Sequence, residues 1–287
     1  MATPATNAIL LISCPDRKGL VAHVSDFIYR HNGNILHADH HIDPEAGLFL
    51  MRIEWSLDDF TLDRNVTSKT FEPLAREFNF DWTLRFSDQV PKAAIFVSKY
   101  DHCLYDLLLR HNAGELRADF SLVVSNHPDC QAIADDFGIE YLVYPISKEN
   151  KLQQESEILT ELGRRNIEFV VLARYMQVLS ESFVSHFPNL IINIHHSFLP
   201  AFVGPKPYIQ AYQRGVKLVG ATGHYVTEEL DNGPIIAQDV IRISHRDSIE
   251  DLIRKGRDLE KLVLARAVRA HLENRVLVYG NKTVVFE

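Results

Sequence analysis

Hydrophobic and polar positions in residues 1–86 change their spacing in a way that predicts a mixed α/β domain. Residues 9–13 read as a strand, and Leu20, Val24 and Ile28 then recur at helical spacing until Gly33. Further strands are expected at residues 34–42, 49–55 and 80–86, with a second helix at residues 68–78. This β-α-β-β-α-β order predicts a ferredoxin-like α+β domain.

The pattern changes after residues 87–92, SDQVPK, which read as a linker. Short apolar runs rich in Val and Ile follow, with helical segments between the earlier ones: AAIFVS, FSLVVSN, IEYLVYPI, IEFVVLAR and LIINIHH. Nearly continuous apolar strands that alternate with helices are typical of a parallel sheet covered on both faces. Two strands around a turn (residues 221–244), a long amphipathic helix (247–275) and a hairpin (276–286) complete the chain. We therefore predict a second domain, residues 93–287, with a Rossmann-like, mostly parallel α/β fold.

Composition restricts the classes of function. The 287 residues are 46% hydrophobic and 24% charged, as expected for a soluble globular protein, and the net charge of −8 argues against a general nucleic-acid binder. No apolar run approaches the length of about 20 residues that spans a membrane, and the N-terminus lacks the basic segment of a signal peptide. Cys14, Cys103 and Cys130 are isolated, which favours a reducing compartment. We expect a cytoplasmic protein with neither nucleic-acid nor membrane partners.

Polar side chains end the apolar run LIINIHH. In a strand, Asn193 and His195 share one side, while His196 takes the other. Because ligands bind beyond the carboxyl ends of parallel strands, this pair is a candidate for a functional site. The alternative is a hydrogen-bonded structural histidine with an asparagine that fixes a turn. No metal is expected, because neighbouring strand residues diverge and His195 and His196 would make a poor chelate.

The segment GHYVTEELDNGPII offers a second candidate. Asp231, Asn232 and Gly233 have the composition of a tight turn, and a turn alone is one interpretation. The other interpretation is that Asp231 is a loop carboxylate delivered over the edge of the sheet. His224 is a further candidate, with a buried structural histidine as its alternative. Spacing alone does not place Asp231 next to His195.

Two motifs in this order, NIHHSFLPAF and GATGHYVTEELDNGPIIAQ, resemble the folate-dependent formyltransferase fold over residues 93–287. The segment CPDRKGLVAHVSDFIYRHNGNIL resembles an ACT domain. Together with HCLYDLLLR, FVGPKPY and YGNKTVVF, the whole chain is similar to the formyltetrahydrofolate deformylases. The resemblance implies hydrolysis of 10-formyltetrahydrofolate to tetrahydrofolate and formate. Such an enzyme balances the one-carbon folate pool and supplies formate for purine biosynthesis, with folate as substrate and no separate cofactor.

The resemblance also implies roles for particular residues. The family's catalytic residues correspond to Asn193, His195 and Asp231. Its folate-binding segments correspond to Arg174, Tyr175, Met176, Val178, Leu179, His224 and Gly233. In this mechanism the amide of Asn193 and a protonated His195 would donate hydrogen bonds to a tetrahedral oxyanion. Asp231 would orient the imidazole and hold the attacking water.

Two other functions stay open from the sequence. A transferase of the same fold would pass the formyl group to glycinamide ribonucleotide, and it carries a glycine-rich loop for the phosphate after its first strand. The corresponding segment here, FVSKYDHCLYDLL, has no glycine between Phe96 and Leu108 and carries the bulky Tyr100 and His102, which favours water as acceptor. A folate or amino-acid sensor without catalysis would require the loss of one of the three polar residues, and all three are present.

The ACT-like domain predicts regulation and assembly. ACT domains commonly pair and bind small ligands, often amino acids, so we expect a homo-oligomer. The candidate effector site is Asp16, Arg17, Gly19, Gly33 and Asn34. The alternative is that the two glycines only permit tight turns and that residues 15–19 cap a helix.

Overall fold

The computed structural model describes residues 6–201 and 207–287. Most of the motif FVGPKPY, residues 202–206, lies outside the described residues. The chain forms two compact units: residues 1–89, 273–279 and 283–287 make up the first, and residues 90–272 and 280–282 the second. The change from the first unit to the second, between Gln89 and Val90, falls within the segment that reads as a linker.

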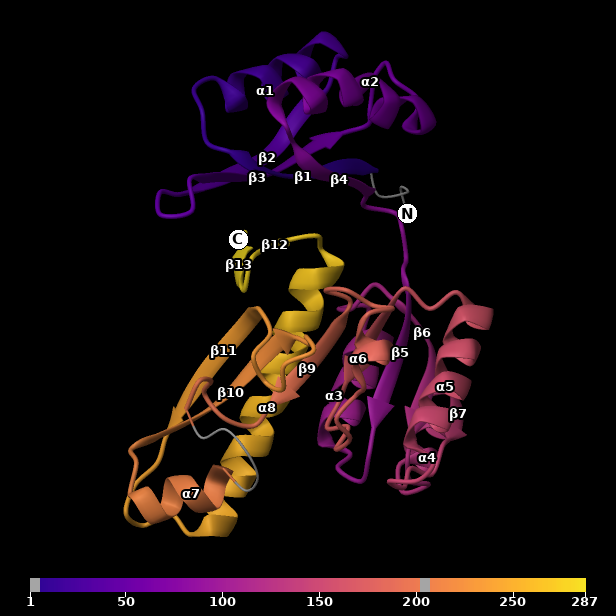
Figure 1. Ribbon diagram of the computed structural model, residues 1–287, viewed down its shortest axis with the longest axis vertical. Coiled ribbons are helices and arrows are strands. Elements are labelled where there is room, and N and C mark those ends of the chain that lie inside the picture. The colour runs from indigo at the N-terminus through magenta and orange to yellow at the C-terminus, as the bar shows by residue number, and fades with distance from the viewer. Residues whose placement is uncertain (1–5, 202–206) are drawn as a thin grey trace. The chain divides into compact units, whose positions relative to one another are not determined.

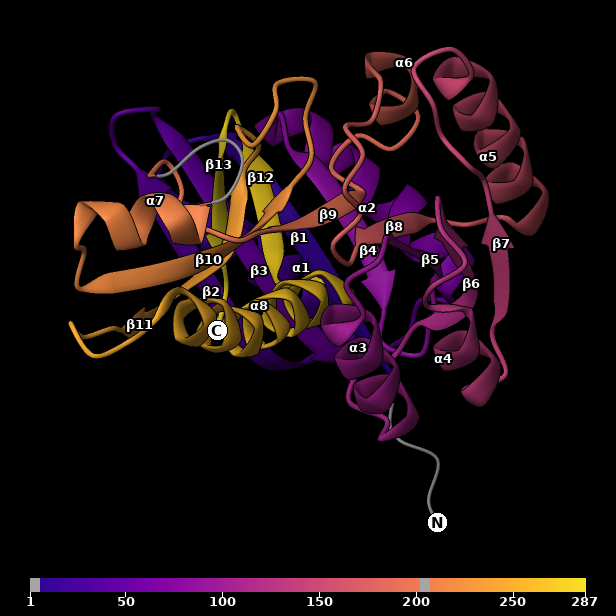
Figure 2. The ribbon, with the colours of Figure 1, turned by 90° about the horizontal axis from the view of Figure 1, so that it is seen from below.

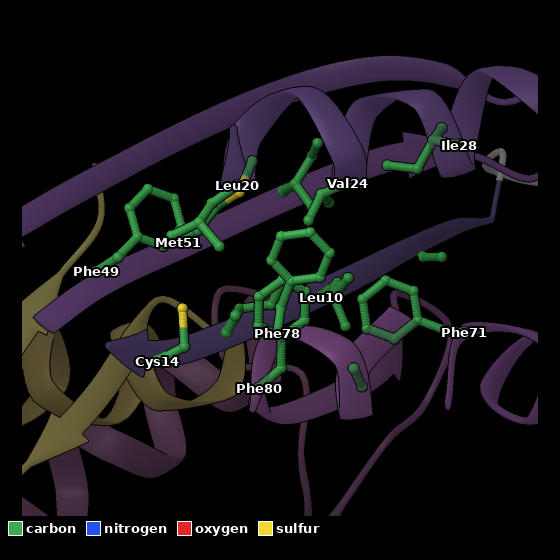
Figure 3. Close-up of a cluster of buried hydrophobic side chains, with 14 of the residues drawn as sticks. Leu10, Cys14, Leu20, Val24, Ile28, Phe49, Met51, Phe71, Phe78 and Phe80 are labelled. Atoms are coloured by element: carbon green, nitrogen blue, oxygen red, sulfur yellow. The ribbon is translucent and has the colours of Figure 1, made fainter. Parts of the chain in front are cut away.

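The first unit is built on a four-stranded antiparallel sheet with the strand order β2-β3-β1-β4. Its elements are β1 (Asn7–Pro15), α1 (Leu20–Arg30), β2 (Asn34–Asp43), β3 (Leu48–Ser56), α2 (Arg64–Phe78) and β4 (Asp81–Phe86). Both helices cover one face of the sheet (Figure 1), where Val24, Phe71 and Phe78 pack on Leu10 and Met51 (Figure 3). The predicted β-α-β-β-α-β order is confirmed.

A C-terminal hairpin covers the other face of this sheet. It consists of β12 (Val276–Tyr279) and β13 (Lys282–Val285), and Leu277 and Phe286 pack against Leu50. The Arg52 guanidinium donates a hydrogen bond to the Asn274 carbonyl, at 3.0 Å. The sequence assigned residues 273–287 to the second domain, and for residues 273–279 and 283–287 that assignment is wrong. The physical reason is that Leu50, on the face opposite the helices, packs against the apolar side chains of the hairpin and is fully buried.

The second unit contains a seven-stranded sheet with the order β11-β10-β9-β8-β5-β6-β7. Its strands are β5 (Lys92–Val97), β6 (Asp119–Ser125), β7 (Glu140–Val143), β8 (Phe169–Leu172), β9 (Ile191–His195), β10 (Leu218–Tyr225) and β11 (Ile235–Arg242). Strands β5 to β9 pair in parallel, whereas β10 and β11 are antiparallel. Its helices are α3 (His102–Asn112), α4 (Gln131–Asp136), α5 (Lys151–Arg165), α6 (Glu181–Val184), α7 (Pro207–Arg214) and α8 (Ile249–Leu272).

Helices cover both faces of this sheet, as the continuous apolar runs predict. Figure 2 shows α5 and α6 on one face and α3, α4 and α8 on the other. Periodicity does not predict α6 and α7, which are too short to show a repeat, nor α3, which carries His102 and Asp106 among its apolar positions. No helix in the described ranges is both long enough and apolar enough to cross a membrane.

The strand order reverses at β5, since β6 and β7 lie on one side of it and β8 and β9 on the other. In open α/β sheets, ligands bind at the carboxyl ends of the strands next to such a reversal. Here the segments after β5 and β8 are joined: the Ser98 amide donates to the Arg174 carbonyl at 3.3 Å, and the Met176 amide donates to the Ser98 hydroxyl at 2.9 Å. This edge of the sheet carries the candidate site.

Candidate active site

The structure brings together the three residues expected to be catalytic. Strand β9 ends at His195, and its pairing with β10 sets Asn193 opposite His224. Asp231 comes from the loop that follows β10, and its Oδ1 lies 3.2 Å from Nδ1 of His195. The side chains of His195 and Asp231 are only 6% and 11% exposed, so the contact is largely shielded from water.

The loop after β10 must turn sharply for Asp231 to reach His195. Asp231 itself has a left-handed backbone with φ of 55°. At Gly233 a Cβ atom would lie 1.8 Å from the Tyr225 carbonyl oxygen, so the loop folds tightly back on the end of β10. The segment is therefore a tight turn that also brings the Asp231 carboxylate to His195.

Replacing Gly233 with Ala is expected to displace Asp231 and to destabilise the fold by about 1–3 kcal/mol, because backbone blocks the new methyl group. Formate release and the denaturant midpoint would both fall. The matched control is Gly163→Ala in α5, where nothing lies within 4 Å of the new Cβ and the helical residue gains stability. If Gly233→Ala behaved like Gly163→Ala, the loop would not constrain Asp231.

The hydrogen bonds of His224 fix its tautomer. Its Nδ1 lies 2.9 Å from the Tyr225 carbonyl oxygen, which can only accept, so Nδ1 carries the proton. Burial lowers the pKa of His224, and the neutral ring accepts at Nε2 from the Asn193 amide, 3.2 Å away. One N–H of the Asn193 amide is thereby anchored, and its second N–H remains for a substrate oxygen.

The ring of His195 has one engaged and one unengaged nitrogen. Nδ1 donates to Asp231, whereas the buried Nε2 has no hydrogen-bond partner within the described residues. Burial alone would raise the pKa of Asp231, but the hydrogen bond from His195 and the charge of that ring outweigh it, so the pKa of Asp231 lies below the usual value. Because the ionised Asp231 carboxylate contacts Nδ1 and Nε2 is unpaired, the His195 ring can exchange a proton with a substrate bound at Nε2.

The residues expected to bind folate differ in their exposure. Arg174 is 10% exposed, and its Nε lies 3.4 Å from Oε2 of Glu260. Met176 and Val178 are exposed by 52% and 56%, beside the same edge of the sheet, and are free to contact a substrate. The other four have packing or hydrogen-bond partners within the fold: Tyr175, Leu179, His224 and Gly233. Tyr175 packs on Phe96 in the core, with Leu179 against the same cluster. Both ring nitrogens of His224 have hydrogen-bond partners, and Gly233 packs against the Tyr225 carbonyl oxygen.

His196 departs from the strand alternation. Because β9 ends at His195, the next side chain does not point to the opposite face, and the two imidazole rings lie 5.3 Å apart. Burial, followed by the nearby Arg174 charge, lowers the pKa of His196 to about 3, so its ring is neutral. The expectation that His195 and His196 diverge is wrong for this reason.

Sequence reasoning missed a buried carboxylate close to this site. Glu260 of α8 is 1% exposed and contacts His102, Arg174 and Tyr208. The signal was present, because Glu260 occupies a position on the apolar face of α8 between Leu259 and Val263. A charged residue on that face needs partners when the helix is buried.

Among the described residues, one group of three side chains could hold a metal ion: His102, Cys103 and Glu260. Their donor atoms lie within 4.8 Å of one another. Both Glu260 oxygens already accept hydrogen bonds from His102 and Tyr208. Burial raises the pKa of the Cys103 thiol well above its ordinary value, which keeps it protonated. We therefore assign no metal to this group.

The effector candidates do not form one site within a single ACT domain. Strands β1 and β2 both pair with β3, and the register sets the end of β1 near Asp43 and the start of β2 near Asn7. Asp16 follows the end of β1 and Asn34 begins β2, so the two residues lie at opposite ends of the sheet. Arg17 donates to the Glu77 carbonyl at 3.1 Å and stacks on the Phe78 ring. Gly19 precedes α1 with φ of 92°, and a Cβ on Gly33 would strike Ile28 at 2.5 Å. Both glycines thus have structural roles.

Comparison with known proteins gives the same two parts. The family model for formyl transferases matches residues 91–268, and the model for ACT domains matches residues 8–63. The chain is thus a formyl transferase domain preceded by an ACT domain. Among its relatives, formyltetrahydrofolate deformylase of Synechocystis is 57% identical over 97% of this chain and 98% of that protein. The deformylase of Bacillus subtilis is 45% identical over 96% and 93%.

Solved structures agree with this assignment. A formyltetrahydrofolate deformylase from Pseudomonas syringae pv. tomato has a TM-score of 0.97 at 49% identity, covering 100% of this chain and 96% of that one. A glycinamide ribonucleotide transformylase from Symbiobacterium toebii has a TM-score of 0.66 at 27% identity, covering 71% and 98%. The chain belongs to the formyltetrahydrofolate deformylase family, as its resemblance implied.

Proposed function

We propose that this protein hydrolyses 10-formyltetrahydrofolate to tetrahydrofolate and formate. The observation that carries the proposal is the buried contact of His195 with Asp231, beside an Asn193 amide that keeps one N–H unused. The names and extensive identity of its relatives support the substrate. Such a reaction supplies formate for purine biosynthesis and balances the one-carbon folate pool.

The first step is attack of water on the formyl carbon. A new carbon–oxygen bond forms, and the carbonyl oxygen becomes an oxyanion. The free N–H of Asn193 and the protonated Nε2 of His195 donate to that oxygen, which is the kind of stabilisation that contributes most in acyl transfer. Asp231 accepts from Nδ1 of His195, and its second oxygen is available to take a hydrogen bond, and then a proton, from the attacking water.

The second step breaks the bond between the formyl carbon and N10. N10 leaves as an amine and takes up a proton, which the His195–Asp231 pair supplies, and the oxyanion collapses to formic acid, which releases its proton to solvent and becomes formate. The two products and that proton together contain the substrate and one water molecule. The low pKa of Asp231 keeps its carboxylate ionised for the next cycle.

Water is the acceptor we favour, because the segment after β5 carries bulky side chains and no glycine where a transferase of this fold has its glycine-rich phosphate loop. Two guanidinium groups lie close to the Tyr100 ring: the central carbons of Arg174 and Arg257 are 5.3 and 5.6 Å from its centre. His102 is tied to Glu260 at 2.8 Å. Release of formate and tetrahydrofolate in equal amounts, with no amine present, tests the proposal, and turnover that required glycinamide ribonucleotide would refute it.

We also propose that the reaction needs no metal ion. All the groups used above are side chains of this chain, and the Glu260 oxygens are engaged by other residues. Dialysis against EDTA is expected to leave the rate of formate release unchanged. A loss of activity on dialysis, restored by a divalent cation, would contradict this expectation.

The ACT unit supports a proposal about regulation. Because Asp16 and Asn34 lie at opposite ends of one sheet, an amino-acid effector site that uses both would need two copies of the chain, as in a homo-oligomer. Calorimetric titration with single amino acids, together with light scattering, is expected to show binding in the oligomer. A monomer that binds none of them would contradict both parts.

We also place the protein in the cytoplasm. Cys14, Cys103 and Cys130 are buried and form no disulfide. Free thiols are typical of proteins in a reducing compartment.

A further inference from the structure

A buried cluster of polar side chains lies beside His196, the neighbour of His195, and is not part of the proposed chemistry. Its centre is Glu260 of α8, which is 1% exposed. Three residues contact this carboxylate: His102 at the start of α3, Arg174 after β8, and Tyr208 of α7. Each belongs to a segment that follows a parallel strand at the edge where Asn193 and His195 lie.

The geometry of the cluster is specific. The Tyr208 hydroxyl donates to Oε1 of Glu260 at 2.5 Å, and Nε2 of His102 lies 2.8 Å from Oε2. Nε of Arg174 is 3.4 Å from the same Oε2. One turn earlier on α8, a Cβ at Gly256 would strike the Tyr208 hydroxyl at 2.1 Å. Gly256 and Glu260 share one face of α8, and Tyr208 packs against that face.

Arg174 is held in a conformation that a non-glycine residue seldom adopts, with φ of 65°. Its side chain is only 10% exposed. Such backbone strain persists where surrounding contacts over-determine it, and it concentrates at functional sites. The Glu260 carboxylate and the Tyr100 ring, 5.3 Å from the guanidinium carbon, supply those contacts.

His196 connects the cluster to His195. Its ring centre lies 5.9 Å from that of Tyr208 and 5.3 Å from that of His195. The ring is neutral, so it places no charge between the cluster and His195. Charges on Arg174 and Glu260 therefore act on His195 across side chains from which water is largely excluded, where electrostatic interactions are stronger than in water.

The charges within the cluster compensate one another. Burial alone would raise the pKa of Glu260, but hydrogen bonds from His102 and Tyr208 and the charge of Arg174 lower it, so the carboxylate is ionised. Its negative charge offsets the Arg174 guanidinium. The titratable and charged groups around His195 and this pair are Asp231, His224, His196, Tyr208, His102, Cys103, Asp106, Arg257 and Lys261.

We propose that Glu260 and Arg174 are positioning residues for His195: a charge-compensated buried pair that fixes the neighbouring His196 through Tyr208 and sets the electrostatic potential in which His195 gains and loses its proton. The inference rests on the proposed hydrolysis, in which His195 moves that proton. Neither residue touches the formyl group in this account.

Two single variants give effects of opposite sign. Glu260→Gln keeps the size of the side chain but leaves the Arg174 charge uncompensated, so the titration midpoint of the His195 imidazole moves to lower pH. Arg174→Gln leaves the carboxylate uncompensated, and the midpoint moves to higher pH. We expect shifts on the order of half a pH unit, because direct charge contacts shift such values by about 1–3 units and these charges act on His195 only across intervening side chains. The double variant returns close to the wild-type midpoint.

The measurement is an NMR titration of protein labelled at histidine Cε1. The chain has 14 histidines, and the resonance lost in His195→Gln identifies the one of interest. The matched control is Glu155→Gln, which neutralises another buried carboxylate of the same unit, 3% exposed, that bonds the Ser180 amide instead. The control leaves the His195 midpoint in place. The limb of the pH–rate profile that follows His195 moves with the NMR midpoint in each variant.

Shifts of the same sign in both single variants, or no shift in either, would overturn the proposal and leave the cluster a packing feature. If Glu260→Gln does not fold, Arg174→Gln tests the sign by itself, and an unchanged or lowered midpoint overturns the proposal. The NMR readout does not depend on turnover. Absence of formate release by the wild type would therefore refute the proposed function alone, whereas normal release with unmoved midpoints would refute only the role of the pair.

Discussion

Replacing Asp231 with Asn is expected to lower kcat for formate release by at least about 10²-fold, with a much smaller effect on KM. The substitution removes the negative charge that lies 3.2 Å from Nδ1 of His195. The imidazole then loses the partner that supports its protonated form, and the attacking water loses its acceptor. Steady-state kinetics of formate release measures both constants.

The backbone makes this substitution a clean one. Asp231 has φ of 55°, and Asn tolerates the left-handed conformation as well as Asp does, so the loop keeps its shape. Asp59→Asn makes the same change at an exposed residue with φ of 61° in the first unit and is expected to leave kcat unchanged. Near-normal turnover by Asp231→Asn would reduce Asp231 to a turn residue.

Replacing Asn193 with Ala is expected to lower kcat by about 10²–10³-fold, the loss typical of removing one oxyanion donor. The amide is held 3.2 Å from Nε2 of a neutral His224, so its remaining N–H is oriented before the substrate arrives. Because the oxyanion exists only in the transition state and the intermediate, KM should change little. The kinetics of formate release at saturating substrate measures the effect.

The comparison variant is Asn126→Ala, at the carboxyl end of β6. Its side-chain oxygen accepts a hydrogen bond from the Ser98 hydroxyl at 2.7 Å, and it therefore supports the same edge of the sheet without facing Asp231. We expect a loss at Asn126 below about tenfold. Equal losses at both asparagines would mean that Asn193 acts only by supporting the fold.

Much of the fold follows from the sequence, because the physical signal is local. Residues 93–98, 120–126 and 190–196 are apolar runs that a covered parallel sheet requires, and β5, β6 and β9 lie within one or two residues of them. The carboxyl-end position of Asn193 and His195 follows from the same pattern. What periodicity cannot predict is which sheet a terminal hairpin will cover, and residues 273–279 and 283–287 were assigned to the wrong unit for this reason.

The candidate site depends more than the fold does on contacts between residues that are far apart in the sequence. The approach of Asp231 to His195 depends on a loop that reverses on itself, which requires the positive φ at Asp231 and the missing side chain at Gly233. The turn-forming composition of residues 231–233 is compatible with this loop conformation but does not predict it. The neighbouring placement of His196 depends on where β9 stops, and strand ends are the least certain feature of any pattern. Glu260 was visible as a charge on an apolar helix face, but its partners come from three distant segments.

The most direct test of the account is the origin of the oxygen in the product. Wild-type protein is incubated with 10-formyltetrahydrofolate in water enriched with ¹⁸O and no added amine, and the released formate is examined by mass spectrometry. A control in which unlabelled formate is incubated alone corrects for exchange. If water is the acceptor, each formate carries one ¹⁸O atom and one oxygen from the formyl group. Formate without label, or turnover that begins only when an amine is added and formylated, would contradict the account.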